Sequence, residues 1–126
     1  MIAKLCGIID SVGDDWCIMD VNGVGYLVAA SAKTLGKLSV GTEASLLTIM
    51  TVREDDISLF GFADAWEKEW FSTLTRVQGV GAKVCLSILS VLTPNQIAQA
   101  IGAQDKTSFC RANGVGPKLA ARIITE

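Results

Sequence analysis

A five-residue motif that occurs twice contains the residues of this chain best suited to chemistry. Residues 79–83 read Gly-Val-Gly-Ala-Lys, and residues 114–118, 35 positions later, read Gly-Val-Gly-Pro-Lys. The two glycines of each copy let the backbone turn sharply and approach another surface closely. A helix that begins after such a turn presents free N–H groups and the positive end of its dipole, which together bind phosphate. The repeat therefore predicts two phosphate-binding hairpins, each with a lysine, Lys83 or Lys118, that adds a point charge.

The flanks of the motif recur as well, which separates it from an ordinary helix end. A single Gly-Val-Gly is most often a helix stop followed by a turn. Here apolar residues also repeat at the 35-residue interval: Leu74 with Phe109, Val77 with Ala112, Cys85 with Ala120, and Ile88 with Ile123. Each copy is therefore predicted to form a helix, a hairpin anchored by its valine, and a second helix. Arg122, one helical turn beyond Lys118, is predicted to extend the second phosphate site.

Two other phosphate-binding motifs are excluded. A dinucleotide fingerprint requires a third glycine where Val84 stands, and it follows a strand rather than a helix. A Walker A motif is absent because the one Gly-Lys pair, Gly36-Lys37, lacks both the leading glycine and the following Ser or Thr. The chain therefore has no visible ATP site.

The distribution of charge along the chain fits phosphate binding better than its sum does. The 126 residues include 11 Lys plus Arg and 13 Asp plus Glu, a formal net charge of −2, which alone argues against a polyanion as partner. Residues 1–62 carry a net charge of −4, whereas residues 72–125 carry six basic residues against Asp105 alone, a net charge of +5. We therefore expect the carboxyl-terminal half to bind nucleic-acid backbone, through contacts that carry no base information.

The composition excludes several classes of protein. Histidine is absent, which removes Ser-His-Asp and Cys-His catalysis and most zinc sites. The four cysteines, Cys6, Cys17, Cys85 and Cys110, form no Cys-x-x-Cys pair and are interpreted as small apolar core residues of a cytosolic protein. No apolar run approaches the ~18 residues of a membrane span, and residues 1–10 lack the apolar core of a signal peptide. We expect a cytoplasmic chain without metal, cofactor or membrane contact.

The first half of the chain has the composition of strands. Five runs of apolar and β-branched residues are predicted as strands: 2–10, 16–21, 24–30, 46–52 and 57–62. Asn22-Gly23 separates the second strand from the third and is typical of a tight hairpin. Ser31 is predicted to cap a short helix at residues 31–38. Five short strands with a helix after the third predict a small closed barrel.

The second half has the period of helices. Asp64 and Glu67 have the spacing of a capping box, and the helix after Asp64 is predicted to bury an apolar stripe: Trp66, Trp70, Phe71, Leu74 and Val77. Further helices are predicted at residues 82–91, 94–102, 106–112 and 117–125, the second of them capped by Thr93 with Gln96 at its third position. The predicted fold class is α+β, with a barrel domain at 1–62 and an all-α domain at 63–126.

These residues resemble those of a known family, the bacterial Holliday-junction branch-migration subunit RuvA. Four stretches carry the resemblance: the amino terminus at 1–7, Asn-Gly-Val-Gly-Tyr at 22–26, Val-Arg-Glu-Asp at 52–55 with Leu-Phe-Gly-Phe at 59–62, and the two glycine repeats. The resemblance covers essentially all 126 residues. It implies an amino-terminal five-stranded OB-fold barrel followed by two helix-hairpin-helix motifs.

The resemblance also implies a function. Family members form homotetramers, or octamers on DNA, which hold a four-way junction in an open square form. They support branch migration by a hexameric RuvB-type motor ATPase in recombination, DNA repair and the SOS response to DNA damage. Glu54 and Asp55 match the family's acidic pin, whose charge repels phosphates near the junction centre and disfavours continuous duplex. The predicted DNA-binding residues are Arg53, Gly79, Val80, Gly81, Lys83, Gly114, Val115, Gly116, Lys118 and Arg122.

The chain departs from the family pattern in three places. Ala112-Asn113 stands where Leu-Pro is common, which predicts a looser turn before the second hairpin, and Ala82 stands where proline is common in the first. The carboxyl-terminal domain that contacts the motor has no counterpart here. We therefore expect a non-catalytic subunit that binds junctions and recruits the motor weakly; a RuvC-type junction resolvase is a further candidate partner.

Two other functions compete with this interpretation. A helix-hairpin-helix glycosylase or nuclease needs a catalytic carboxylate or lysine beside the hairpin, but no acidic residue follows Gly116 before Glu126. A protein-interaction module would use the barrel and hairpins without DNA. From composition alone, residues 53–56 would be a solvated charged turn. A metal site there is disfavoured, since three consecutive carboxylates converge poorly on one ion.

Overall fold

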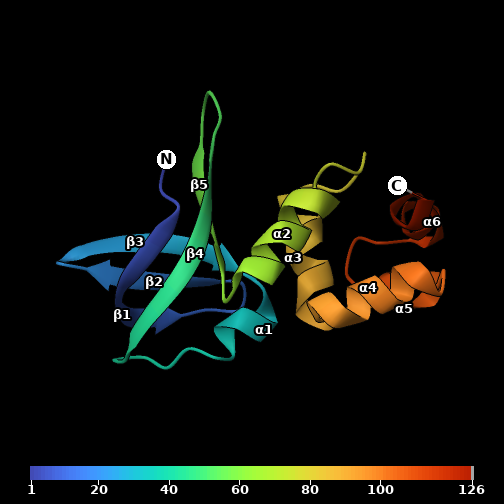
Figure 1. The fold of residues 1–126 in the computed structure, drawn as a ribbon. Helices are drawn as coiled ribbons and strands as arrows, with labels where there is room; N and C mark the ends of the chain where they lie inside the picture. The colour runs from blue at the N-terminus through green and yellow to red at the C-terminus, as the bar shows by residue number, and fades with distance from the viewer. Residues whose placement is uncertain (126) are drawn as a thin grey trace. The chain divides into compact units, whose positions relative to one another are not determined.

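A computed structural model describes residues 1–125 and contains a small barrel followed by helices (Figure 1). The chain divides into two compact units, Met1–Lys68 and Glu69–Glu126. The first unit contains the strands and the second contains both glycine repeats. The predicted class, a closed five-stranded barrel before tandem helix-hairpin-helix motifs, is confirmed.

Five strands form the barrel of the first unit. They are β1 (Lys4–Val12), β2 (Trp16–Val21), β3 (Val24–Ala30), β4 (Glu43–Val52) and β5 (Ile57–Phe62). The strands close in the order β1-β2-β3-β5-β4, with β3 and β5 parallel and all other neighbours antiparallel. Closure pairs strands that would otherwise leave exposed edges in so small a sheet.

The hairpin between β2 and β3 has the geometry predicted from its sequence. Asn22 and Gly23 both have positive φ, 53° and 91°, which is the conformation that a two-residue type I′ turn requires. The carboxylate of Asp20 accepts a hydrogen bond of 2.7 Å from the backbone N–H of Gly23. Val21 and Val24 then form the first pair of the ladder, which sets the register of both strands.

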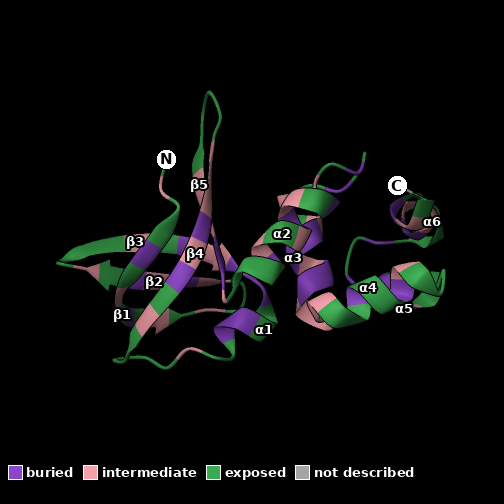
Figure 2. Ribbon diagram, in the orientation of Figure 1, coloured by how far each residue is buried: buried purple, intermediate pink, exposed green. Residues whose placement is uncertain are grey.

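Alternate residues of the strands fill the barrel. The buried cluster is apolar throughout and comprises Leu5, Ile9, Cys17, Met19, Val28, Ala30, Leu35 and Leu46. Figure 2 shows the resulting alternation of buried and exposed positions along the strands. Burial raises the pKa of the Cys17 thiol, which keeps it neutral and unreactive. Cys17 and Cys85 are therefore small apolar core residues, as predicted, whereas Cys6 and Cys110 are exposed, so the prediction is wrong for these two.

Helix α1 (Ala32–Leu35) lies between β3 and β4 and is shorter than the predicted 31–38. Ser31 caps it as expected, since its hydroxyl accepts the N–H of Thr34 at 3.2 Å. The helix stops because Gly36 follows Leu35, and glycine is a poor helix former.

Glu67 joins the beginning of α2 (Ala65–Leu74) to the barrel. Asp64 accepts the N–H of Glu67 at 2.9 Å, as a capping residue does. The side chain of Glu67 does not complete the predicted capping box. Its buried carboxylate instead accepts hydrogen bonds from the hydroxyls of Ser31 at 3.0 Å and Thr34 at 2.5 Å, and from the N–H of Ala63 at 3.1 Å.

Trp66 is a second correction to the predicted α2. The hydrophobic pattern predicts that it is buried, but 57% of its surface is exposed. The buried stripe of α2 contains Glu67, Phe71 and Leu74, at the spacing i, i+4 and i+7 of one helix face. Trp66 precedes that stripe by one position and therefore points about 100° away from it.

The remaining helices follow the predicted pattern closely. They are α3 (Ala82–Val91), α4 (Pro94–Gly102), α5 (Lys106–Cys110) and α6 (Pro117–Thr125). Thr93 and Gln96 form the predicted capping box of α4. Helix α5 ends two residues before the predicted 112, because the N–H of Ala112 already bonds to the carbonyl of Phe109 in a tighter turn. No single described helix is long and apolar enough to cross a bilayer, although α3 and α4, bent by 94°, reach the length and composition together.

We expect Glu67→Ala to lower the free energy of unfolding by about 2–4 kcal/mol, because two hydroxyls and a backbone N–H lose their buried acceptor. Urea unfolding measures the change. Glu69→Ala, at an exposed position of the same helix, is the matched control and should change stability by less than about 0.5 kcal/mol. Equal losses in the two variants would contradict the role given to Glu67.

Candidate nucleic-acid interface

The first glycine of each motif is required by the backbone conformation. Gly79 and Gly114 have φ values of +94° and +88°, a region that L side chains rarely adopt. A Cβ atom on Gly79 would lie 3.2 Å from Leu119 of α6, and one on Gly114 would lie 3.3 Å from Val84 of α3. Leu119 and Val84 are themselves 35 residues apart. Each hairpin thus packs against the helix that follows the other hairpin.

The valines of the motif hold both hairpins in the core of the second unit. Val80 and Val115 are buried, as predicted. The repeat-related apolar residues around them are buried too: Leu74, Val77, Cys85, Ile88, Phe109, Ala112, Ala120 and Ile123. The N–H of Val80 bonds to the carbonyl of Val77 at 3.0 Å, and that of Val115 bonds to Ala112 at 3.2 Å. The second hairpin therefore closes with the same backbone hydrogen bond as the first, although Ala112-Asn113 stands where Leu-Pro is common in the family.

The second glycine of each motif faces open space. A Cβ atom on Gly81 or Gly116 would meet no heavy atom within 4 Å. Gly81 precedes α3 with φ −85°, and no side chain caps the first N–H groups of that helix. Gly116 stands in the same place before α6, and its carbonyl accepts the N–H of Ala120 as Gly81 accepts that of Cys85. Both helix N-termini are therefore accessible to an approaching anion.

The predicted cations lie beside these open turns. Lys83 and Lys118 belong to the first turns of α3 and α6, and neither forms an ion pair within residues 1–125. Arg122 is exposed, but its Nη1 atom donates a hydrogen bond of 2.9 Å to the backbone carbonyl of Gln78. Arg122 therefore fastens α6 to the first hairpin, while its remaining N–H groups stay accessible. Ser87 occupies the corresponding position of the first motif, so this bond has no counterpart there.

Asp105, the one acidic residue among residues 72–125, has a local structural role. Its side chain accepts hydrogen bonds from the hydroxyl of Ser108 at 2.7 Å and the N–H of Ser108 at 3.2 Å. These bonds, the hydroxyl first, hold the pKa of Asp105 below its ordinary value. Asp105 thereby caps α5, the helix that leads into the second hairpin.

The predicted pin residues lie at the tip of the β4–β5 hairpin. β4 pairs with β1 only from Glu43 to Leu47, and β5 pairs with β3 only at Phe60 and Gly61. Thr48 still bonds to the carbonyls of Ala3 and Ile2. Beyond it, the two strands pair with each other, out to Val52 and Ile57. Figure 1 shows the hairpin extending as a two-stranded ribbon beyond the ring of the barrel.

The acidic side chains at the tip differ in their surroundings. The N–H of Arg53 bonds to the carbonyl of Asp56 at 2.7 Å, which leaves Glu54 and Asp55 as the two residues of the turn. The carboxylate of Asp56 accepts a hydrogen bond of 2.8 Å from the hydroxyl of Ser58. Arg53, Glu54 and Asp55 are exposed. The structure therefore separates two outermost carboxylates from a third that is bonded back along β5.

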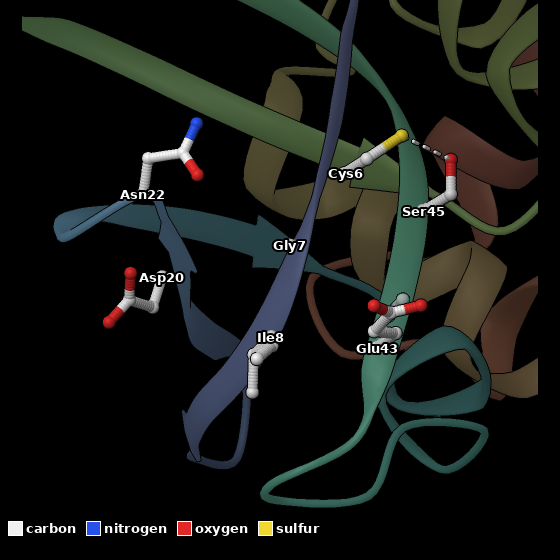
Figure 3. A pocket seen from close by; sticks show the side chains of 8 residues that line it. Cys6, Gly7, Ile8, Asp20, Asn22, Glu43 and Ser45 are labelled. Atoms are coloured by element: carbon white, nitrogen blue, oxygen red, sulfur yellow. Dashed lines mark hydrogen bonds between the residues drawn. The ribbon is translucent and has the colours of Figure 1, made fainter.

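A hollow of about 710 Å³ on the first unit is unsuited to phosphate (Figure 3). It is lined by residues of β1, β2 and β4 and by Asn22, and it includes the carboxylates of Asp20 and Glu43 but no lysine or arginine. The thiol of Cys6 lies at its wall and donates to the hydroxyl of Ser45 at 3.3 Å. In the described part of the chain, no three His, Cys, Asp or Glu side chains lie close enough together to hold a metal ion.

The structure places the sequence-predicted residues in two groups. The glycines, valines, lysines and Arg122 come together on the paired hairpins of the second unit, whereas residues 53–55 lie at the ribbon tip of the first. The sequence pattern did not reveal the contacts of Leu119 and Val84 with the opposite hairpins. The signal that could have found them is that Leu119 and Val84 occupy equivalent positions of the two repeats, 35 residues apart.

Comparisons with known proteins identify both units. The RuvA N terminal domain family matches residues 1–61, and the SAM-like Helix-hairpin-helix tandem family matches residues 71–126. The chain is 64% identical over 126 residues to the Holliday junction branch migration complex subunit RuvA of Paramagnetospirillum magneticum. It is 61% and 58% identical over 127 residues to the proteins of that name from Rhodospirillum centenum and Rhizobium meliloti. Each alignment covers 100% of this chain but only 59%, 62% and 62% of the respective relative.

We expect the two glycines of each motif to respond differently to alanine. Gly79→Ala and Gly114→Ala should each lower the free energy of unfolding by about 1 kcal/mol or more, because a Cβ is strained at positive φ. Gly81→Ala and Gly116→Ala should change it by less than about 0.5 kcal/mol, since neither φ is positive and nothing obstructs the new methyl group. Thermal unfolding of the four variants measures the contrast; equal destabilisation at both positions would contradict it.

Proposed function

This chain belongs to the RuvA family, and on that premise we propose that it is a subunit that binds four-way Holliday junctions and supports branch migration in recombination and DNA repair. The observation that carries the proposal is the pair of equivalent hairpins, each with open helix N–H groups at Gly81 or Gly116 and a lysine in the first turn of the helix that follows. Two such sites in one unit can hold two stretches of DNA backbone. The chain spans about three fifths of the length of the curated relatives, so the activity is proposed for the part that it represents.

We assign different tasks to the two units. The second unit, with its excess of basic residues, holds phosphates. The first unit presents Glu54 and Asp55 at the end of a ribbon, where their charge repels the backbone of a continuous duplex. At an open junction the strands separate at the centre, so a projecting acidic tip fits there and parts the strands that exchange between arms. Arg53, adjacent to the tip, is proposed to contact DNA beside it.

A homotetramer with fourfold symmetry, or an octamer on DNA, is proposed as the assembly. Four arms of a junction present four equivalent backbones, which suits four copies of the chain. Exposed large apolar side chains on the barrel strands, Ile8, Val12, Val24 and Leu27, offer surface for contacts between copies. Native mass spectrometry at the mass of four chains tests this assembly.

The subunit is proposed to be non-catalytic and to act in the cytoplasm, where a bacterial chromosome lies. A hexameric RuvB-type ATPase would supply the work of branch migration, through parts of the relatives that this chain does not cover. A RuvC-type resolvase is a further proposed partner on the junction. A glycosylase or nuclease function is not favoured, because the curated relatives are named as branch-migration subunits.

Binding of an immobile four-way junction compared with a linear duplex of equal length tests the proposal. We expect the junction to bind at least about tenfold more tightly in a gel-shift titration. Gly81→Ala with Gly116→Ala should weaken junction binding by about tenfold or more, because each methyl group stands between the helix N–H groups and phosphate. Gly102→Ala, also in open space, is the control. Equal affinity of the wild-type chain for junction and duplex, or none for either, would refute the proposed function.

Neutralising the pin should relax the preference for junctions. We expect Glu54→Gln with Asp55→Asn to raise affinity for linear duplex several-fold, because two repulsive charges are removed. Asp14→Asn with Asp15→Asn is the matched control, since these are consecutive exposed acids on another turn of the barrel. The same titration measures both double variants at low and high salt. If discrimination is unchanged, or if the control changes it equally, the pin role is wrong.

A further inference from the structure

We propose that Arg76 and Arg111 bind DNA phosphate on the amino-terminal side of the two hairpins, beside the phosphates held by the glycine turns. The inference rests on the proposed function and adds a binding residue to each hairpin. Neither arginine belongs to the Gly-Val-Gly-x-Lys motif. Each lies three residues before its first glycine, and the two are 35 residues apart.

The repeat pairs only some of the basic residues in this region. Lys83 pairs with Lys118, and Arg76 pairs with Arg111. By contrast, Lys106 corresponds to Phe71, and Arg122 corresponds to Ser87. The positive charges that both motifs share are therefore one arginine before each turn and one lysine after it.

The backbone places the two arginines equivalently. The N–H of Arg76 bonds to the carbonyl of Thr73 at 3.2 Å, and that of Arg111 bonds to Ser108 at 3.3 Å. In both motifs the next residue is buried and bonds back by the same three-residue step, at 3.0 Å and 3.1 Å. Each arginine thus precedes its own closed turn at the same position, whereas the lysine follows that turn.

Within the described residues, the guanidinium groups of Arg76 and Arg111 have no polar contact of their own. Both arginines are exposed, and neither side chain has a hydrogen bond or ion pair within residues 1–125. Arg122 differs, because it donates to the carbonyl of Gln78. Asp105, the nearest acid in sequence to Arg111, is already occupied by Ser108. Two repeated cations without a partner in the described fold are available to an external anion.

Phosphate is the anion that this arrangement suits. The N–H groups at each turn hold one phosphate, and a nucleic-acid strand presents further phosphates on either side of it. Arginine binds phosphate through two parallel N–H bonds, which fixes position as well as charge. An arginine before the turn and a lysine after it therefore bracket the phosphate at the glycines and extend each hairpin along the strand.

The test compares Arg76→Gln and Arg111→Gln, singly and together, with Lys106→Gln. Lys106 lies in the helix that precedes Arg111, is exposed and has no basic counterpart in the repeat. Affinity for the junction is titrated at several salt concentrations, and thermal unfolding checks that each variant folds. We expect each arginine variant to bind several-fold more weakly and to reduce the slope of log affinity against log salt by about 0.9 for each phosphate that is no longer neutralised. Lys106→Gln should change the slope much less.

The outcomes separate this inference from the proposed function. If both arginine variants match Lys106→Gln while the wild-type chain still prefers the junction, the inference is overturned and the function stands. If the wild-type chain shows no preference for junctions, the function fails. The same salt titration on linear duplex then decides the inference, because phosphate contacts form on any backbone. On linear duplex, the inference is supported if Arg76→Gln and Arg111→Gln reduce the salt slope equally. It is overturned if their reductions are no larger than that of Lys106→Gln.

Discussion

The reciprocal packing of each hairpin against the helix that follows the other is the contact on which the proposed phosphate-binding surface depends. Gly79 lies against Leu119, and Gly114 lies against Val84, at distances that leave no room for a Cβ atom without movement. Neither turn is held by its own two helices alone. The hydrogen bond from Arg122 to Gln78 adds a link in one direction only. The two turns therefore form one continuous surface, and loosening either one disturbs the other.

Charge is divided between the units in a way that suits a branched polyanion. In the second unit the basic side chains that the repeat shares have no partner within residues 1–125, whereas Asp105, the acid between them in sequence, is held by Ser108. In the first unit the outermost carboxylates, Glu54 and Asp55, lie at the end of a ribbon. The net charge of −2 combines a net charge of +5 over residues 72–125 with an excess of acidic residues elsewhere, of which Glu54 and Asp55 lie at the ribbon tip. Its small size says nothing about affinity for DNA.

Turns and helix caps that depend on one or two neighbouring residues are predicted well from the sequence. The choice of which side chain is buried, when two residues compete for one position, is not. The Asn22-Gly23 turn and the capping box at Thr93 follow from preferences of single residues, and both are confirmed. Trp66 is misplaced because a hydrophobic pattern assumes that the larger apolar residue faces inward. A carboxylate takes that direction instead, since Glu67 accepts hydrogen bonds from Ser31 and Thr34 at helix α1 and from Ala63 after β5. No pattern along the chain shows those donors, which lie up to 36 residues away.

The sequence by itself determined the order of the elements, the two glycine turns and the residue types at each, because glycine and valine at fixed spacing favour one local conformation. Only the tertiary structure decided the different roles of the two glycines in each motif. The first glycine is required by positive φ and by the opposite helix, and the second, such as Gly81, faces open solvent. It also decided that the carboxylate of Asp56 accepts a hydrogen bond from the hydroxyl of Ser58. Spacing along a chain specifies conformation locally, but the neighbours of an atom are set by segments far away in sequence.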